Sequence, residues 1–255
     1  MNPPINDWKQ RRVWVIGAST GIGAETAKRL LSYGAEVALS ARQLLGLQET
    51  AKGYPQAIIE PVDITELASL QAAHARLLQR WQGIDLVLIV AGTYNEMRAD
   101  SFDMAAANQL LDINIRGVYH CLDVVLPTFL QQGHGGIGIV GSVAGLSGLP
   151  KALVYGPSKA AIINLCESLY MDLRPHHVAV YLINPGFVAT PLTEKNDFEM
   201  PALMTAHDAA AALVKGLEKG DFHIHFPKRF TNWLRLARLL PYRAYFYLVH
   251  KVTGL

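Results

Sequence analysis

The sequence alternates between short apolar runs that are typical of buried strands and longer segments with helical periodicity. Strand-like runs occur at residues 13–16, 36–40, 57–62, 84–90, 137–142, 178–183 and 222–226, and helical patterns at 24–31, 43–52, 65–81, 105–131, 153–174 and 207–219. Continuous apolar strands separated by helices predict a parallel sheet that is covered on both faces. Right-handed crossovers then make the sheet doubly wound. We therefore expect an α/β fold of about seven strands in a single domain, residues 1–255.

A glycine cluster separates the first predicted strand from the first predicted helix. Residues 17–23 read Gly-Ala-Ser-Thr-Gly-Ile-Gly. Glycines permit a tight turn, and the N-terminus of the following helix offers free amides and a positive dipole end to a pyrophosphate. The spacing Gly-x3-Gly-x-Gly differs from the commonest dinucleotide fingerprint, Gly-x-Gly-x2-Gly. Its place between a strand and a helix nevertheless predicts a dinucleotide site.

The residues that end the second predicted strand bear on the choice of nucleotide. A carboxylate there would bind the ribose 2′-hydroxyl of NAD, whereas a cation would accept the 2′-phosphate of NADP. The sequence here is Ser40-Ala41-Arg42, without an acid, which favours NADP(H). The alternative is that Arg42 is a solvated residue that opens a surface helix. Asp63, after the third strand, has two equal interpretations: it faces the adenine end of a cofactor, or it signals a helix start.

A tyrosine and a lysine four residues apart lie on one predicted helix. At this spacing Tyr155 and Lys159 share a helix face, so both can point into one cleft. A nearby cation favours the phenolate, so Lys159 is expected to lower the pKa of Tyr155 and Tyr155 to exchange a proton with a substrate oxygen. Ser142 can donate a hydrogen bond to the same oxygen. Pro157 requires that the helix begin just before it. The commoner alternative is an ordinary Tyr and Lys pair on a surface helix.

Three further polar residues need an explanation. Asn114 falls inside the predicted helix 105–131, where a buried amide is costly unless it is used, so it is either a structural bridge or part of a polar relay. His223 and His225 share a face of the last strand. Because no third ligand has suitable spacing, we interpret both histidines as structural and predict no metal site.

Together these motifs resemble the compact subgroup of the short-chain dehydrogenases/reductases over residues 11–226. The resemblance implies a Rossmann fold, a nicotinamide cofactor and a catalytic tetrad of Asn114, Ser142, Tyr155 and Lys159. Two departures stand out: Ile89-Val90 replaces a usual pair of asparagines, and Thr20 lies where NADP-dependent members often have Arg or Lys. The motifs that match are residues 17–23, Asp63, Ala91-Gly92, Asn114, Ser142, Tyr155-x3-Lys159 and Asn184-Pro185-Gly186.

The resemblance also implies a role for each site residue. Hydride would pass between the nicotinamide ring and the substrate carbon while Tyr155 transfers the proton. Lys159 would also bind the nicotinamide ribose, and Asn114 would hold a water molecule in a proton relay. The implied cofactor-binding residues are Gly17, Ser19, Thr20, Gly21, Ile22, Gly23, Arg42, Asp63, Ile64, Ala91, Gly92, Tyr155, Lys159, Pro185, Gly186, Val188 and Thr190.

Residues 227–255 form a basic amphipathic extension in this interpretation. From Phe222 to Leu255 there are six Lys and Arg residues and no acid, and helices are expected at 232–240 and 242–249. Such stripes usually pack over a cleft or on another subunit, which we favour. Peripheral contact with a membrane interface is the alternative. Nucleic-acid binding is not expected, because the basic residues are few and no recognition motif accompanies them.

The predicted function is that of an NADP(H)-dependent oxidoreductase that acts on a carbonyl/alcohol pair, with a catalytically silent dinucleotide-binding regulator or scaffold as the alternative. An apolar substrate is expected from the residues after the sixth strand. We expect a homodimer or homotetramer formed through helices 105–131 and 153–174. Without a signal-peptide pattern or a membrane span, and with two reduced cysteines, the expected location is cytoplasmic, or peripheral at the inner face of a membrane. The apolar residues are Phe187, Leu192, Phe198, Met200, Leu203 and Met204.

Overall fold

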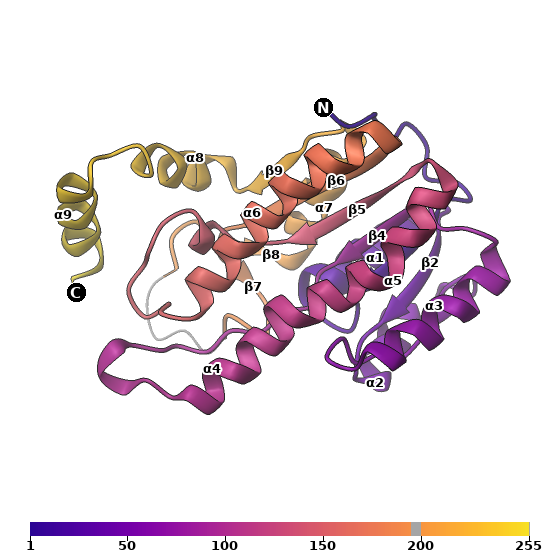
Figure 1. The fold of residues 1–255 in the computed structure, drawn as a ribbon, viewed down its shortest axis with the longest axis horizontal. Coiled ribbons are helices and arrows are strands. Elements are labelled where there is room, and N and C mark those ends of the chain that lie inside the picture. Colours follow the sequence, from indigo (N-terminus) through magenta and orange to yellow (C-terminus); the bar gives the residue numbers. More distant parts are fainter. Residues whose placement is uncertain (195–199, 255) are drawn as a thin grey trace.

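A computed structural model describes residues 1–194 and 200–254 of the chain. Seven strands form one sheet in the order β3-β2-β1-β4-β5-β6-β9, and every neighbouring pair is parallel (Figure 1). The predicted doubly wound parallel sheet is therefore confirmed. The strands are β1 (Arg12–Ile16), β2 (Glu36–Ser40), β3 (Ile58–Ile59), β4 (Leu86–Ile89), β5 (Gly135–Val140), β6 (Val178–Pro185) and β9 (His223–Phe226), and β7 (Val188–Ala189) pairs separately with β8 (Met204–Thr205).

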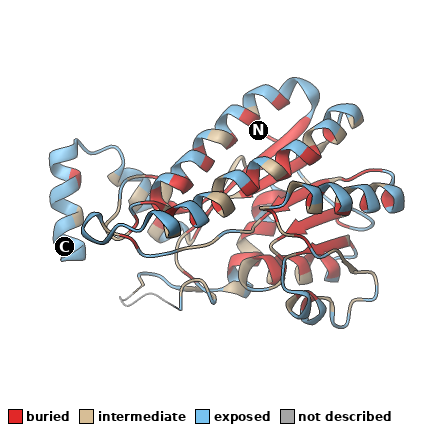
Figure 2. Cartoon of the chain, turned by 60° about the horizontal axis from the view of Figure 1, so that its bottom comes forward, coloured by how far each residue is buried: buried red, intermediate tan, exposed pale blue. Residues whose placement is uncertain are grey.

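Helices cover both faces of the sheet, and the strands are buried between them (Figures 1 and 2). Helices α1 (Gly21–Ser32), α2 (Leu44–Ala51) and α7 (Ala206–Glu218) pack on one face, and α3 (Leu67–Trp81), α5 (Gly117–Gln132) and α6 (Tyr155–Leu173) on the other. Strand β1 shows how the two cores arise. Val13 and Val15 pack in the core under α1, α2 and α7, while Trp14 and Ile16 pack in the core under α3, α5 and α6. Successive side chains of a strand point to opposite faces, so one strand contributes to both cores.

Two predicted elements differ in detail from the observed ones. The third strand, expected over residues 57–62, comprises Ile58–Ile59. The chain still follows β2 beyond that point, since Glu60 N donates to Leu39 O at 3.0 Å. The predicted helix 105–131 is made of α4 (Met104–Leu111), a π-helical turn (Asp112–Arg116) and α5. Short 3-10 turns occupy Ala99–Ser101, Val143–Gly145 and Arg174–His176.

The C-terminal helices begin earlier, or extend further, than the sequence pattern suggested. Helix α8 spans Lys228–Ala237 rather than 232–240, and α9 spans Tyr242–Thr253 rather than 242–249. Each helix follows a proline, Pro227 or Pro241, which has the extended backbone of an N-cap residue. Both helices lie beyond the end of the sheet, with α9 the outermost element (Figure 1).

Two observations bear on the expected compartment. Cys121 and Cys166 are buried and free, as predicted, and burial raises the pKa of each thiol to about 12, so both are neutral. They pack in the hydrophobic core on the α5 and α6 side of the sheet. Within residues 1–194 and 200–254, no helix has both the length and the apolar character needed to cross a bilayer.

An ion pair joins the beginnings of β1 and β4, which are neighbours in the sheet. Arg12 and Asp85 form a two-pronged contact, with Nη2 to Oδ1 at 2.8 Å and Nε to Oδ2 at 3.0 Å. Arg12 also donates from Nη1 to the carbonyl of Trp81 at 2.8 Å, which ties the end of α3 to the same point. Burial raises the pKa of Asp85, but the hydrogen bonds and positive charge of Arg12 outweigh it, and the net pKa lies below its usual value.

Asp85→Asn is expected to lower the free energy of unfolding at pH 7 by about 1–3 kcal/mol, because it removes a charged hydrogen-bond partner. The pKa of Asp85 is lowered on folding, so its stabilising effect is complete above the unfolded pKa of about 3.9 and is lost as the pH falls through the folded pKa. Urea denaturation at neutral and at acid pH measures both effects. Asp100→Asn, at an ion pair whose acid is 73% exposed, is the control. Equal losses in the two variants at pH 7 would contradict the assignment.

Candidate functional site

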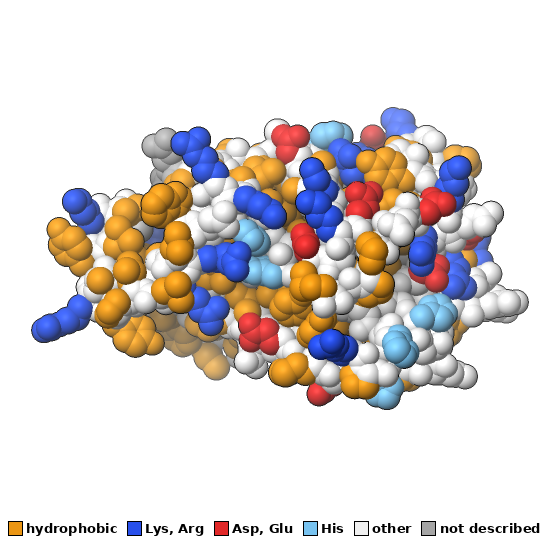
Figure 3. Space-filling view, turned by 90° about the horizontal axis from the view of Figure 1, so that it is seen from above, with side chains coloured by type: hydrophobic (Ala, Val, Ile, Leu, Met, Phe, Trp, Pro, Cys, Tyr) orange, Lys and Arg blue, Asp and Glu red, His pale blue; other side chains and the backbone are white. Residues whose placement is uncertain are grey.

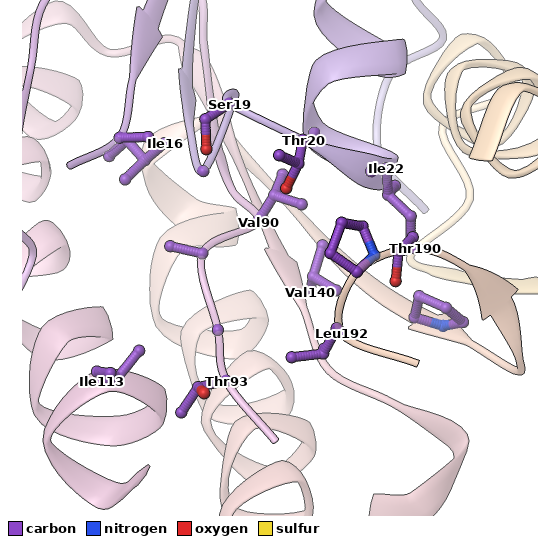
Figure 4. Close-up of a pocket in the computed structure, with 18 of the residues that line it drawn as sticks. Ile16, Ser19, Thr20, Ile22, Val90, Thr93, Ile113, Val140, Thr190 and Leu192 are labelled. Carbon is purple, nitrogen blue, oxygen red and sulfur yellow. The ribbon is translucent and has the colours of Figure 1, made fainter. Parts of the chain in front are cut away.

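A cleft of about 420 Å³ lies at the carboxyl ends of the parallel strands. This is the edge where open α/β sheets bind ligands, because the strand order reverses there. Strand β1 contributes Ile16 to the wall and β5 contributes Val140, while other lining residues follow β2, β4 and β6. In Figure 4, Ser19 and Thr20 lie at one end of the cleft and Thr93 and Ile113 at the other.

The glycine turn between β1 and α1 closes one end of this cleft. Backbone N–H groups of Gly17 and Ala18 both donate to Ser40 O, at 2.7 and 3.0 Å, and so fix the turn against β2. Gly17 has a φ of +102°, and a Cβ atom there would collide with the backbone of Ala91. No described side chain caps the start of α1, so its first amides are free to bind an anion. The predicted pyrophosphate cradle is therefore sterically open and has suitable donors.

Arg42, expected to select the nucleotide, and Asp63, expected to face the adenine end of the cofactor or to signal a helix start, both line the cleft. Arg42 is exposed at the cleft, whereas the Ser40 hydroxyl is buried and donates to Glu60 O at 2.7 Å. Asp63 lines the cleft and also organises the turn before α3, since its Oδ1 accepts from Thr65 N at 2.9 Å and from Thr65 Oγ1 at 2.7 Å. Both interpretations of Asp63 thus have a structural basis.

Tyr155 is the first residue of α6, which begins just before Pro157 as predicted. The Tyr155 hydroxyl is hydrogen-bonded to Ser142. Ser142 Oγ accepts from Ala144 N at 3.1 Å, which leaves the Ser142 hydrogen for the Tyr155 oxygen. Burial raises the pKa of Tyr155 above its ordinary value, and the hydrogen bond with Ser142 only partly opposes this. Tyr155 is therefore a neutral phenol at pH 7.

Lys159 lies under the Tyr155 ring, with Nζ 5.8 Å from the ring centre. It is 5% exposed, and Nζ donates to the carbonyl of Val140 at 2.9 Å. Burial lowers the pKa of Lys159 from 10.5 to about 8. The expectation that Lys159 draws the pKa of Tyr155 below its ordinary value is not met in this structure, because desolvation is the larger effect on both groups.

Asn114 is buried in the π-helical turn and bridges two segments behind the cleft. Its Oδ1 accepts from Thr93 N at 2.8 Å, and its Nδ2 donates to Thr93 O at 2.9 Å and to Ser158 Oγ at 3.3 Å. Ser158 in turn donates to Tyr155 O at 2.7 Å. Asn114 therefore links the chain after β4 to the first turn of α6, as the structural-bridge alternative proposed.

The cleft brings together nearly all the residues that the sequence singled out. Every predicted cofactor-binding residue lines it, as do Ser142, Tyr155 and Lys159, while Asn114 lies behind the wall. Sequence reasoning missed several lining residues that directly follow the same strand ends or flank the predicted ones. They include Gln43, Thr93, Ile113, Val140, Gly141 and Thr193.

The predicted apolar wall is only partly present in the cleft. Leu192 lines it, whereas Phe187 packs against Phe230 at a ring separation of 5.7 Å. Leu203 is 48% exposed, and Met204 packs on the core that α7 shares. Phe198 lies outside the described residues.

The two histidines of β9 have structural contacts. Their rings lie 4.9 Å apart, and His225 Nδ1 is 2.6 Å from Thr231 Oγ1. Burial is the main reason that the pKa of each is lowered to about 4, so both are neutral near pH 7. In the part of the chain that the structure describes, no group of three or more His, Cys, Asp or Glu residues could hold a metal ion.

Comparisons with known proteins agree with this geometry. The family model described as short chain dehydrogenase matches residues 11–200. An uncharacterized oxidoreductase of Myxococcus xanthus is 36% identical over 91% of this chain and 93% of its own. A short-chain dehydrogenase/reductase from Burkholderia phymatum, solved with NAD, has a TM-score of 0.83 at 23% identity and covers 91% of this chain and 94% of its own. A 3-ketoacyl-(acyl-carrier-protein) reductase from Brucella melitensis, solved with NADH, has a TM-score of 0.77 at 22% identity over 86% of this chain and 98% of its own.

Lys159→Met is expected to relieve a stability cost that depends on pH. Because folding lowers the pKa of Lys159, the unfolded chain binds the proton more tightly, so the charge opposes folding below about pH 8. This cost fades as the pH rises from about 8 to 10.5. The stability difference between Lys159→Met and the unsubstituted chain should therefore shrink by about 3 kcal/mol over that range.

Urea denaturation followed by circular dichroism across this pH range measures the change. Lys52→Met is the matched control, because the Lys52 side chain is 76% exposed, and its effect should not vary with pH in this way. A pH-independent difference for Lys159→Met would contradict the buried charge.

Proposed function

This chain belongs to the short-chain dehydrogenase family of oxidoreductases, and we propose that it is an NADP(H)-dependent member that interconverts a carbonyl compound and the corresponding alcohol. The observation that carries the proposal is that Ser142, Tyr155 and Lys159 line the same cleft, with Lys159 Nζ 5.8 Å from the centre of the Tyr155 ring. When bound, the nicotinamide supplies a hydride to the substrate carbon in reduction or accepts one in oxidation. The open glycine turn and the free amides of α1 fit such a dinucleotide.

Tyr155 and Ser142 act together on the substrate oxygen in this proposal. Tyr155 is a neutral phenol at pH 7, so it holds the proton that a carbonyl oxygen takes up as it gains negative charge in the reducing direction. The Ser142 hydroxyl stabilises the same oxygen by a hydrogen bond. Lys159, still largely protonated at pH 7, offsets the negative charge left on Tyr155. Asn114 holds the start of α6 in position through Ser158, and we propose that it also orders a water molecule in the proton relay.

The preference for NADP(H) rests on the charges around the adenosine end of the cleft. Arg42 lines the cleft directly after β2, where an acid would favour NAD(H). Among the described lining residues the only acid is Asp63, whose Oδ1 already accepts two hydrogen bonds from Thr65. The solved relatives with NAD and NADH show that the fold itself accepts the other cofactor, so the charge at Arg42 is the feature to test.

Substrate, assembly and location complete the proposal. We propose an apolar substrate, since Ile113, Val140 and Leu192 line the cleft. The chain is proposed to be a single Rossmann-type domain with residues 227–255 as a C-terminal extension. It would form a homodimer or homotetramer through α5 and α6, where Tyr119 and Met171 are exposed. Two buried free thiols support a reducing, cytoplasmic location.

Tyr155→Phe is expected to lower kcat for NADPH-dependent carbonyl reduction by about 10²- to 10⁴-fold, because it removes the proton donor. Turnover is measured as NADPH oxidation against a chain-length series of aldehydes, ketones and 3-oxoacyl thioesters. The dissociation constant of NADPH, measured by fluorescence, should change little. Full turnover in the variant would exclude the proton-transfer role. Tight NADPH binding without turnover by the unsubstituted chain on any substrate would instead favour a silent dinucleotide-binding regulator.

Arg42→Asp is expected to weaken NADPH binding by about 10- to 100-fold, because a charged hydrogen bond to the 2′-phosphate is replaced by repulsion. Binding of NADH should be unchanged or tighter, since the new carboxylate can accept from the ribose 2′-hydroxyl. Isothermal titration with both cofactors measures the ratio. Arg80→Asp, at an exposed arginine on α3, controls for the change in net charge. An unchanged ratio in Arg42→Asp would contradict the assignment.

A further inference from the structure

The outer surface of α8 and α9, which we call the C-terminal face, is apolar and uncovered by any described residue. Six of its large side chains are between 57% and 79% exposed, and Tyr247 on α9 is 68% exposed. Helix α7, by contrast, buries its apolar stripe against the sheet and α1. Folded chains rarely expose so many large apolar side chains together unless the surface binds something. The six side chains are Trp233, Leu236, Leu239, Tyr242, Phe246 and Val252.

The same face carries a one-sided charge. The sequence from Phe222 to Leu255 contains six basic residues and no acid. Because the whole chain has a formal net charge of +2, these six positive charges leave −4 for the rest. In Figure 3, Lys and Arg side chains lie among hydrophobic ones at the end of the molecule that carries α8 and α9. The basic residues are Lys228, Arg229, Arg235, Arg238, Arg243 and Lys251.

Specific contacts hold both helices in place. His225 lies 3.1 Å from Arg235 Nη1, and because the guanidinium can only donate, His225 Nε2 accepts and Nδ1 donates to Thr231 Oγ1. Thr231 is fully buried, so α8 is fixed to the end of β9. Tyr245, the buried residue of α9, donates from its hydroxyl to Gly148 O at 2.7 Å. The apolar side chains are therefore presented outward by anchored helices.

These observations distinguish between possible occupants. A second copy placed by two-fold symmetry would set the same positive face against itself, which is unfavourable. Lengths of about 15 Å for α8 and 18 Å for α9 are too short to cross a hydrocarbon core of about 30 Å, but a helix lying flat needs no such length. Exposed Trp and Tyr side chains suit the interface of a bilayer, and Lys and Arg suit anionic headgroups.

We propose that α8 and α9 dock on the surface of an anionic lipid bilayer, with Trp233 and Phe246 inserted at the headgroup level and the basic side chains bound to the lipid phosphates and carboxylates. The described part of the chain leaves the stripe exposed, so the helices do not bury it within one copy. We choose the membrane alternative from the sequence over packing on another subunit because of the positive charge that accompanies the stripe. Tyr245 contacts the loop that joins Ser142 to Tyr155, so docking brings that loop close to the lipid. Delivery of an apolar substrate from the bilayer to the cleft rests on the proposed function, whereas docking itself does not.

The test is flotation of the full chain with phosphatidylcholine vesicles, with and without phosphatidylserine. The unsubstituted protein should float with the anionic vesicles and much less with the neutral ones, and binding should weaken as salt is added. Each basic residue contributes about fivefold to partitioning on such a surface, so the double variant Arg238→Glu/Arg243→Glu should bind more than tenfold more weakly. Trp233→Ala/Phe246→Ala should also lose binding, through its lost apolar contact.

Matched controls alter the same residue types on other surfaces. Lys52→Glu/Arg80→Glu makes the same change in net charge, and Leu45→Ala/Phe102→Ala removes apolar side chains that are 81% and 53% exposed. Both controls should bind vesicles as the unsubstituted chain does. Circular dichroism and NADPH binding report that each variant is folded, independently of turnover.

Three results would overturn the proposal. They are no flotation with anionic vesicles, undiminished flotation of Arg238→Glu/Arg243→Glu, and equal losses in the test and control variants. Light scattering on the vesicle-free protein adds a decisive comparison. If Trp233→Ala/Phe246→Ala lowers the molecular mass of the assembly and vesicles bind none of the proteins, the C-terminal face is an interface between copies of the chain.

Discussion

Parallel pairing of the seven strands places all their carboxyl ends at one edge of the sheet, and the site depends on this constraint. The chain must leave β1 and enter α1 directly beside the exit from β4, where Gly17 lies against Ala91. Only a residue without a Cβ atom fits there, and the same close approach leaves the first amides of α1 pointing into open space. One steric requirement therefore fixes the strand order locally and creates a position where an anion can bind.

Burial sets the chemistry of the residues across the cleft. Tyr155 and Lys159 share a helix face, but desolvation shifts both toward their neutral forms, which raises the pKa of one and lowers that of the other. At pH 7 Tyr155 therefore keeps its proton, and Lys159, with a pKa of about 8, is still mostly charged. Ser142 partly opposes the rise in the pKa of Tyr155. Its hydroxyl can stabilise the phenolate or, alternatively, a substrate oxygen. Burial of Lys159 beside the Tyr155 ring therefore carries a stability cost at pH 7.

Much of the fold and the site follows from local sequence signals. Strand and helix periods, the glycine turn and the Tyr155 and Lys159 spacing each depend on neighbouring residues, and sequence reasoning placed them correctly. The sign of the pKa shift at Tyr155 depends on how deeply α6 is buried, which no spacing reveals. The π-helical turn around Asn114 has the same apolar pattern as an α-helix, so periodicity could not distinguish them. The apolar run over residues 57–62 did indicate the path of the chain, since Glu60 N and Val62 N still donate to Leu39 O and Ala41 O, although only Ile58–Ile59 form a regular strand.

The contrast between α7 and the C-terminal helices shows where amphipathic periodicity stops being informative. All three have an apolar stripe, yet α7 meets α1 and the sheet, whereas α8 and α9 extend past the last strand and meet little of the chain. Helix α8 is anchored through Thr231 and through Phe230 and Leu234, which pack against the core. Helix α9 is anchored through the Tyr245 hydroxyl, and these contacts leave the large side chains of the C-terminal face exposed. Specific hydrogen bonds thus hold α8 and α9 with apolar and basic side chains facing solvent. This arrangement suits binding to a surface outside the chain. An anionic bilayer meets both requirements at once, since it offers apolar depth and negative charge in one plane.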